Sequence, residues 1–277
     1  MPFSQNLSSI RLAAASATAL MLALSVPSSA TENDVPSKTI EALKQSVVPI
    51  VCRAADASGK TIIADKPDTT TPLVFGTGFF VNDRGDFMTA QHVIDDAHEF
   101  SLVHQCEPAM YLPVDDWPNR EFFGGQTFGI ARCAQNEQFD VAVCSLVDNP
   151  FNDASVAKPK VAQLEFSQQP DGTAVAFSGF PLGNMIPITS KGFVATYRFK
   201  GDEPSELVLD KANWPGASGS PVYLPNGKVV GVILSRGVND GSGLSYARAL
   251  AVVRGFLAEH AVPGGGEAPA KLSSGAP

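Results

Sequence analysis

The segment Gly216-Ala217-Ser218-Gly219-Ser220-Pro221 is the most informative part of this chain about its fold. Two other short motifs precede it along the chain, Thr89-Ala90-Gln91-His92 and Phe139-Asp140-Val141-Ala142. A serine in a glycine-flanked turn, a histidine after a small-residue strand end and an aspartate opening an apolar strand are the three parts of an acyl-transfer site. The same catalytic geometry occurs on unrelated folds in different chain orders, so the order histidine, aspartate, serine restricts the fold.

Each of these residues has a chemical role at such a site. A serine hydroxyl is a weak nucleophile at neutral pH, so Ser218 needs a base, and His92 can take its proton and return it to the leaving group. Asp140 precedes an apolar run and would be partly buried, where its charge needs a partner such as an imidazole N–H. The backbone N–H groups of Gly216 and Ser218 would form an oxyanion hole. Each motif alone also fits an ordinary surface or turn residue, but together they predict a catalytic site.

Short apolar runs separated by turn residues dominate the chain after residue 47. Strands this brief, with turns such as residues 82–85 and 225–227 between them, favour an all-β fold over alternating strands and helices. Helical spacing is confined to residues 37–45 and to about residues 249–260. The runs that we expect to form strands are residues 47–52, 73–75, 79–81, 100–103, 141–143, 175–177, 193–196 and 229–234.

The ends of the chain lie outside the expected fold. Residues 1–30 combine the basic Arg11, an apolar run over residues 12–26 and small residues up to Ala30, which is typical of an export signal cleaved after Ala30. The apolar run is shorter than the roughly 18 residues that span a bilayer, so no permanent membrane anchor is expected. These features predict a secreted or periplasmic protein. Residues 263–277, rich in Gly, Pro, Ala and Ser, are expected to form a disordered tail.

Composition supports a globular domain over residues 31–262. Hydrophobic residues make up 44% of the chain and charged residues 17%, which is enough apolar surface for a large core. The formal net charge of −8 argues against nucleic acid and against anionic lipid as partners.

The chain has four cysteines, an even number that fits disulfides in an exported protein. Cys52, Cys106, Cys133 and Cys144 can pair in three ways, and the sequence does not choose between them. A zinc site made of Cys106, Cys133 and His104 is the alternative. It lacks the Cys-x-x-Cys or His-x-x-x-His spacing of zinc ligands, so we predict no metal.

The region from Val47 to Leu257 resembles the trypsin-like serine proteases of bacteria, near their HtrA-type and glutamyl-endopeptidase branches. The resemblance rests on residues 76–93, 139–143, 178–183, 189–194 and 213–221. It implies two six-stranded antiparallel β-barrels, at about residues 47–160 and 161–249, followed by a C-terminal helix at about residues 249–260. It also implies a serine endopeptidase that acts on proteins or peptides through His92, Asp140 and Ser218 without a cofactor.

The same resemblance indicates which residues line the substrate pocket. No acidic residue stands six positions before the nucleophile, so cleavage after Lys or Arg is not expected, and Ile233 replaces the histidine of the glutamyl-specific branch. An apolar pocket favours cleavage after small or medium apolar residues. The predicted pocket residues are Ala212, Ile233, Leu234, Ser235, Arg236 and Leu244.

The chain departs from the family at several points. Ala217 replaces the usual Asn or Asp before the nucleophile, and Gln91 replaces a small residue or Asn before the histidine, but neither change removes a catalytic group. Residues 107–125 are expected to form an extra loop between His92 and Asp140. HtrA-type chains usually continue into a PDZ domain, for which too few residues follow the predicted C-terminal helix.

Two other functions fit parts of the sequence. A catalytically silent protein of the same fold could act as a protein-binding or chaperone-like module, but the chain retains all three catalytic side chains. An α/β-hydrolase esterase is disfavoured because the motif reads Gly-x-Ser-x-Ser and no suitable acid and histidine follow it in the required order.

Overall fold

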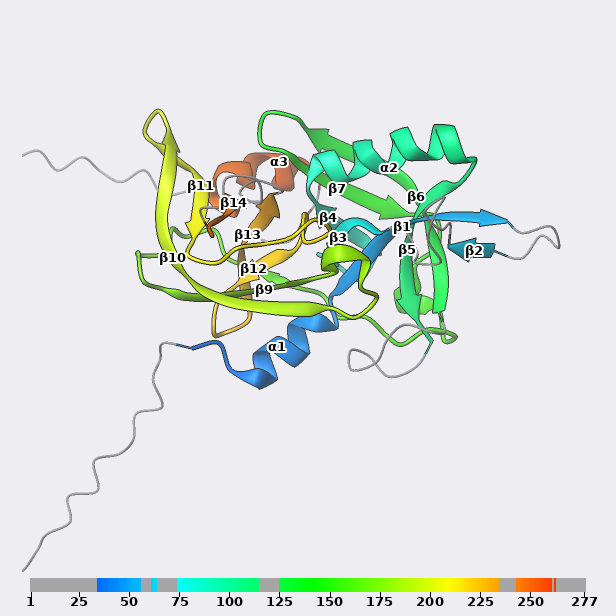
Figure 1. Cartoon of the computed structure of the whole chain (residues 1–277), viewed down its shortest axis with the longest axis horizontal. Coiled ribbons are helices and arrows are strands. Elements are labelled where there is room, and N and C mark those ends of the chain that lie inside the picture. Colours follow the sequence, from blue (N-terminus) through cyan, green and yellow to red (C-terminus); the bar gives the residue numbers. More distant parts are fainter. Residues whose placement is uncertain are drawn as a thin grey trace, which may run out of the picture. The chain divides into compact units, whose positions relative to one another are not determined.

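The computed structural model describes residues 34–55, 61–63, 74–114, 125–234, 243–260 and 262 (Figure 1). The predicted export signal and the predicted tail lie outside these residues, and so do Ser235 and Arg236 of the predicted pocket. None of the helices in the described part of the chain is long and apolar enough to cross a membrane.

The first half of the described chain forms a closed β-barrel (Figure 1). Six antiparallel strands follow the order β1-β3-β4-β7-β6-β5, and β5 pairs with β1 to close the barrel, while β2 pairs with β1 outside it. Closure removes the free sheet edges that would otherwise invite pairing with other chains. The strands are β1 (Val47–Ala55), β2 (Thr61–Ile63), β3 (Val74–Phe80), β4 (Asp86–Thr89), β5 (Glu107–Pro113), β6 (Gly125–Asn136) and β7 (Val141–Leu146).

The second half forms another closed barrel of six antiparallel strands. Their order is β12-β9-β10-β11-β14-β13, closed by the β12–β13 pair, and β8 joins β13 in parallel from outside. The two barrels confirm the predicted fold. The strands are β8 (Gln163–Leu164), β9 (Ala174–Gly179), β10 (Ile188–Lys200), β11 (Glu203–Leu209), β12 (Pro221–Tyr223), β13 (Lys228–Leu234) and β14 (Ser245–Ala249).

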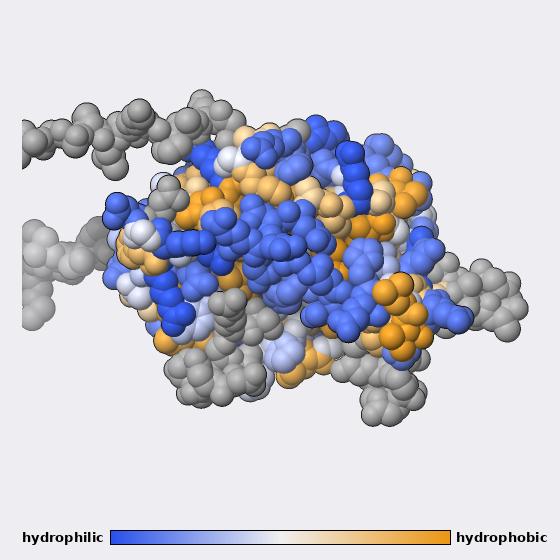
Figure 2. Space-filling view, turned by 90° about the horizontal axis from the view of Figure 1, so that it is seen from above, coloured by the Kyte–Doolittle hydropathy of each residue, from blue (hydrophilic) through white to orange (hydrophobic). Residues whose placement is uncertain are grey.

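Three hydrophobic clusters hold the fold together. One lies on the first barrel and includes Ile50, Phe80 and Phe87. A second belongs to the second barrel, and the third joins residues of both barrels with the terminal helices, for example Phe79 with Tyr223. Hydrophilic side chains cover much of the face seen in Figure 2, with hydrophobic groups showing between them.

Three α-helices accompany the barrels, and one of them was not predicted. The expected N-terminal helix is α1 (Ser37–Lys44), which packs against β9, and the expected C-terminal helix is α3 (Arg254–Glu259). The unexpected helix is α2 (Gln91–His104). The described chain also contains the short 3-10 turns η1 (Pro150–Asn152), η2 (Pro181–Gly183) and η3 (Leu250–Val253).

The strand expected at residues 100–103 is therefore wrong, because these residues are helical in α2. Val93, Ile94 and Ala97 are the residues that α2 buries, at helical spacing. Leu102 and Val103 are 85% and 72% exposed, so the apolar run that suggested a strand faces solvent.

The extra loop expected at residues 107–125 is shorter than predicted. Its first seven residues form β5, because Val51 and Cys52 of β1 pair in register with Ala109 and Pro108. Gly125 already begins β6.

Two disulfides settle the cysteine pairing that the sequence left open. Cys52 pairs with Cys106 where β5 begins beside β1, and Cys133 pairs with Cys144 directly across the β6–β7 ladder. The Cα atoms are 5.6 Å apart in the first pair and 4.0 Å apart in the second. Cys106 and Cys133 are therefore not free thiolates, and the zinc alternative is wrong.

Candidate active site

His92 and Asp140 are in direct contact, although they are 48 positions apart in the sequence. The Nδ1 atom of His92 lies 3.0 Å from Oδ1 and 2.9 Å from Oδ2 of Asp140. The backbone N–H of His92 donates to the same Oδ1 atom at 3.0 Å. A carboxylate in this position holds the imidazole with a proton on Nδ1 and leaves Nε2 as the basic atom.

The start of α2 explains why Asp140 lies there. Ala90, the N-cap residue of α2, has no side chain that can accept from the first turn. Asp140 supplies the missing acceptor from the turn before β7, and its negative charge is favourable at a helix N-terminus. Asp140 adopts a left-handed conformation with φ of 53°, which aspartate tolerates better than most residues.

The Nε2 atom of His92 is buried and has no hydrogen-bond partner among the residues that the structure describes. Ser218 is thus not hydrogen-bonded to it.

Asp96 lies one turn further along α2 than His92. Burial raises the pKa of the Asp96 carboxyl, and His92 opposes this shift. Smaller contributions from the neighbouring carboxylates of Asp95, Glu99 and Asp140 also raise the pKa. Asp96 was not among the predicted site residues, and the signal that could have indicated it is its i+4 spacing from His92 on a helix.

The loop that carries Ser218 has a conformation that only glycine permits at two positions. Gly216 has φ of 91° and Gly219 has φ of 83°. A Cβ atom on Gly216 would strike the carbonyl oxygen of Phe180, and one on Gly219 would strike the carbonyl oxygen of Thr77. Ser218 itself is 3% exposed.

The loop is also tied to its surroundings through its backbone. Gly219 N–H donates to the carbonyl of Ile233 on β13 at 2.8 Å, and Ala217 N–H donates to Trp214 at 2.9 Å. The N–H groups of Gly216 and Ser218, which we predicted to form the oxyanion hole, donate no hydrogen bond within the described ranges. Neither donor is therefore committed to an acceptor among the described residues.

Close packing brings the serine loop beside the beginning of α2. A Cβ atom on Gly76 of β3 would lie 2.9 Å from the carbonyl oxygen of Ser218 and 2.6 Å from the side chain of Val93. Because Gly76 has no side chain, the loop of Ser218 and the residue that follows His92 can approach the same point of β3.

The predicted pocket residues occupy different environments. Ala212 and Leu244 are half-buried. Ile233 is fully buried in the core of the second barrel, and Leu234 packs with the cluster of the first barrel. The side-chain amide of Asn213 donates to the carbonyl of Leu234 at 2.9 Å and so joins the serine loop to β13.

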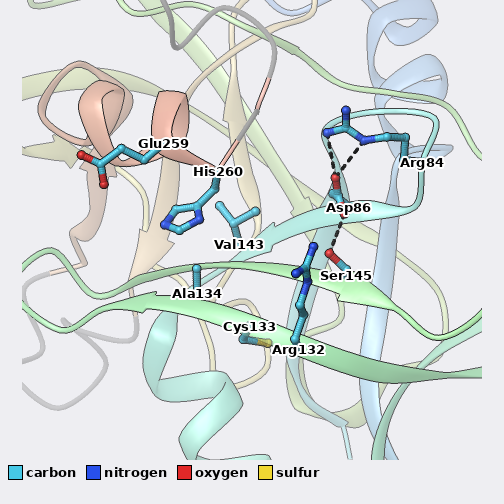
Figure 3. A pocket seen from close by; sticks show the side chains of 9 residues that line it. All are labelled: Arg84, Asp86, Arg132, Cys133, Ala134, Val143, Ser145, Glu259 and His260. Carbon is cyan, nitrogen blue, oxygen red and sulfur yellow. Dashed lines mark hydrogen bonds and ion pairs between the residues drawn. The ribbon is translucent and has the colours of Figure 1, made fainter.

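A cavity of about 710 Å³ lies away from these residues, between the outer face of the first barrel and the end of α3 (Figure 3). Arg84 and Ser145 both contact Asp86 there, at 3.0 and 2.7 Å. Burial raises the pKa of Asp86, but hydrogen bonds from Ser145, Asn82 and Arg84 outweigh it and hold the pKa below its usual range. The lining residues are Arg84, Asp86, Arg132, Cys133, Ala134, Val143, Ser145, Glu259 and His260, none of which we predicted to be catalytic.

The fold and this arrangement define a two-barrel β-protein with the architecture of trypsin-like proteases. Residues 76–232 match the family model of the trypsin-like peptidase domain. The chain belongs to this family and is a trypsin-like peptidase.

Solved structures are similar to the chain in fold. The active form of the Rv3671c protease from M. tuberculosis is 20% identical, with a TM-score of 0.55 over 82% of this chain and 86% of that one. The inactive form of the same protease is 18% identical, with a TM-score of 0.53 over 81% of this chain and 93% of that one. No curated protein sequence matched the chain.

Proposed function

We propose that the chain is an exported serine endopeptidase that uses Ser218 as nucleophile, His92 as base and acid, and Asp140 as the group that orients the imidazole. One observation carries this proposal: Asp140 contacts Nδ1 and the backbone N–H of His92, while the buried Nε2 atom has no partner among the described residues. A buried polar atom without a partner is rare and often marks a functional group. Catalytic hydrogen bonds are often long in unliganded enzymes and shorten when substrate binds.

The reaction would proceed through an acyl-enzyme. The Oγ atom of Ser218 attacks the scissile carbonyl carbon while its proton moves to Nε2 of His92. The N–H groups of Gly216 and Ser218 stabilise the oxyanion of the tetrahedral intermediate. His92 then protonates the leaving amine, the peptide bond breaks, and a water molecule activated by His92 releases the acyl group in the same way.

The proposed specificity is cleavage after small or medium apolar residues. The half-buried Ala212 and Leu244 support an apolar pocket wall, and the other two described residues of the predicted pocket, Ile233 and Leu234, are buried apolar side chains. Such a pocket rejects charged side chains but separates similar aliphatic ones only weakly, because one methylene is worth about 1–3 kcal/mol.

Export is proposed from residues 1–30, with cleavage after Ala30 and a folded domain over residues 31–262. The two disulfides support this proposal, because disulfides persist in oxidising compartments outside the cytoplasm.

The test compares the mature wild type with Ser218→Ala on unfolded casein, with cleavage sites mapped by mass spectrometry. Wild type should cut after residues such as Ala, Val and Leu and should react with a fluorophosphonate at Ser218. Ser218→Ala should lower hydrolysis about a millionfold and abolish labelling, because no other nucleophile replaces the hydroxyl. Circular dichroism would verify that the variant is folded.

Other outcomes would contradict parts of the proposal. Labelling that persists in Ser218→Ala would mean that the nucleophile is another residue. Casein that stays uncut by folded wild type would favour the protein-binding alternative. Cuts confined to Arg, Lys or Glu would overturn the proposed specificity and leave the mechanism intact.

A further inference from the structure

Thr77 of β3, in the first barrel, lies at the centre of a buried hydrogen-bond group that reaches the serine loop in the second barrel. Its hydroxyl donates to the carbonyl of Gly216 at 3.0 Å and accepts from the N–H of Phe180 at 3.1 Å. Its backbone N–H donates to the carbonyl of Ser218 at 2.8 Å. Its backbone carbonyl accepts from the hydroxyl of Thr89 at 2.8 Å.

These bonds act on the two residues whose N–H groups would bind the oxyanion. The carbonyls of Gly216 and Ser218 are each held by an atom of Thr77, so neither residue can rotate freely about its backbone bonds. Gly216 needs this restraint more than most residues, since at φ of 91° it occupies a region where glycine has other conformations of similar energy. Fixed donors cost no reorganisation when the charge develops.

The hydroxyl group of Thr77 suits the position because it is both donor and acceptor. Thr77 is completely buried, so loss of the hydroxyl would remove two buried hydrogen bonds, one to the carbonyl of Gly216 and one from the N–H of Phe180. Gly179 makes room for the group, because a Cβ atom there would lie 2.6 Å from the hydroxyl oxygen of Thr77.

We infer that Thr77 is a positioning residue that holds the oxyanion-binding N–H groups of Gly216 and Ser218 in place. The inference rests on the proposed function of the serine loop. Thr77 does not touch substrate; it acts from the first barrel through the carbonyls of the loop. It therefore makes the geometry of the oxyanion hole depend on the contact between the two barrels.

The experiment compares wild type with Thr77→Val, which keeps the shape of the side chain and removes the hydroxyl, and Thr77→Ser, which keeps the hydroxyl. The readouts are kcat and KM on a fluorogenic peptide taken from the casein cleavage sites, and the rate of labelling by a fluorophosphonate. Thr189→Val is the matched control, because it removes the hydroxyl of a different threonine, on β10 of the second barrel, where this hydroxyl contacts that of Ser178 at 2.8 Å. Thermal unfolding is measured for all variants.

Thr77→Val should lower both kcat and the labelling rate about 10- to 100-fold with KM nearly unchanged, since the lost interaction acts on the transition state. Thr77→Ser should restore most of the rate, and Thr189→Val should match wild type per folded molecule. If Thr77 had only a structural role, Thr77→Val would have a lower unfolding temperature, but kcat per folded molecule would not fall while KM stays unchanged. Folded Thr77→Val with wild-type kcat, or Thr77→Ser as slow as Thr77→Val, would overturn the inference.

If Thr77→Val does not fold, Thr77→Ala provides the same test with a smaller side chain, measured as kcat per folded molecule. Failure of the proposed function is separable from failure of this inference. If the proposed function is wrong, Ser218→Ala would still be labelled. If only the role of Thr77 is wrong, Ser218→Ala would behave as predicted and only the Thr77 variants would not show the predicted change in kcat.

Discussion

Asp140 combines two roles in one side chain. It accepts the N–H of His92 at the start of α2, and it contacts Nδ1 of the same residue. A single carboxylate therefore sets both the position of the helix that carries His92 and the orientation of its ring. The left-handed backbone of Asp140 at φ of 53° is the local strain that this geometry requires.

Asp140→Asn should separate these two roles. Asparagine tolerates the left-handed conformation and its amide oxygen can still accept from the helix N–H, so the fold should be retained. It cannot favour the proton on Nδ1 as a carboxylate does, and we expect kcat to fall about 10⁴-fold. Steady-state kinetics with a thermal unfolding control would measure this. Unchanged kcat in the folded variant would show that Asp140 does not orient His92.

Among the strands of the first barrel, each of the two disulfides links a neighbouring pair. The two disulfides close loops of very different length. Cys52 and Cys106 are 54 residues apart in sequence and link β1 with the start of β5, where the barrel closes. Cys133 and Cys144 are 11 residues apart and link β6 with β7. The second pair lies within one hairpin whose register already holds the strands together.

Replacing each pair by serines should therefore destabilise the protein unequally. The chain-entropy model gives a loss of about 4 kcal/mol for the long loop and about 3 kcal/mol for the short one. Urea unfolding of Cys52→Ser/Cys106→Ser and of Cys133→Ser/Cys144→Ser would measure the two free energies. A larger loss for the hairpin disulfide would contradict the prediction.

The whole molecule depends on buried contacts between the barrels. Arg248 of β14 is 7% exposed, and its guanidinium donates to the carbonyl of Phe139 at 2.6 Å and to that of Ser205 at 2.8 Å. Phe139 precedes Asp140 in the first barrel, whereas Ser205 and the nearby Glu206 belong to β11. One side chain thus joins the aspartate turn to the second barrel.

Arg248→Met should lower the free energy of unfolding by about 3–5 kcal/mol, because it leaves buried acceptors and the carboxylate of Glu206 without this partner. Arg198→Met is the matched control: Arg198 lies 3.6 Å from the same carboxylate, but its side chain is 57% exposed. The control should change stability by less than about 1 kcal/mol. Urea unfolding would measure both variants, and equal losses would contradict a special role for Arg248.

Patterns within a few neighbouring residues were sufficient to predict the fold class and the three candidate catalytic residues. Brief apolar runs between turns predicted an all-β fold, and the family resemblance supplied the two barrels and their number of strands. The motifs around His92, Asp140 and Ser218 predicted which side chains to examine, because backbone requirements such as the positive φ of Gly216 and Gly219 leave a mark in the sequence itself. The helix α2 was missed because its buried face, at Val93, Ile94 and Ala97, is short.

Tertiary structure alone decided the cysteine pairing, the capping of α2 by Asp140 and the roles of Thr77 and Arg248. Thr77 and Gly216 are 139 residues apart, and Arg248 and Phe139 are 109 apart. A hydrogen bond between such residues depends on how two barrels pack, and a threonine or an arginine carries no local signal of its distant partner. Folding brings these groups into a buried interior, where each polar atom must find a partner, and that requirement fixes their roles.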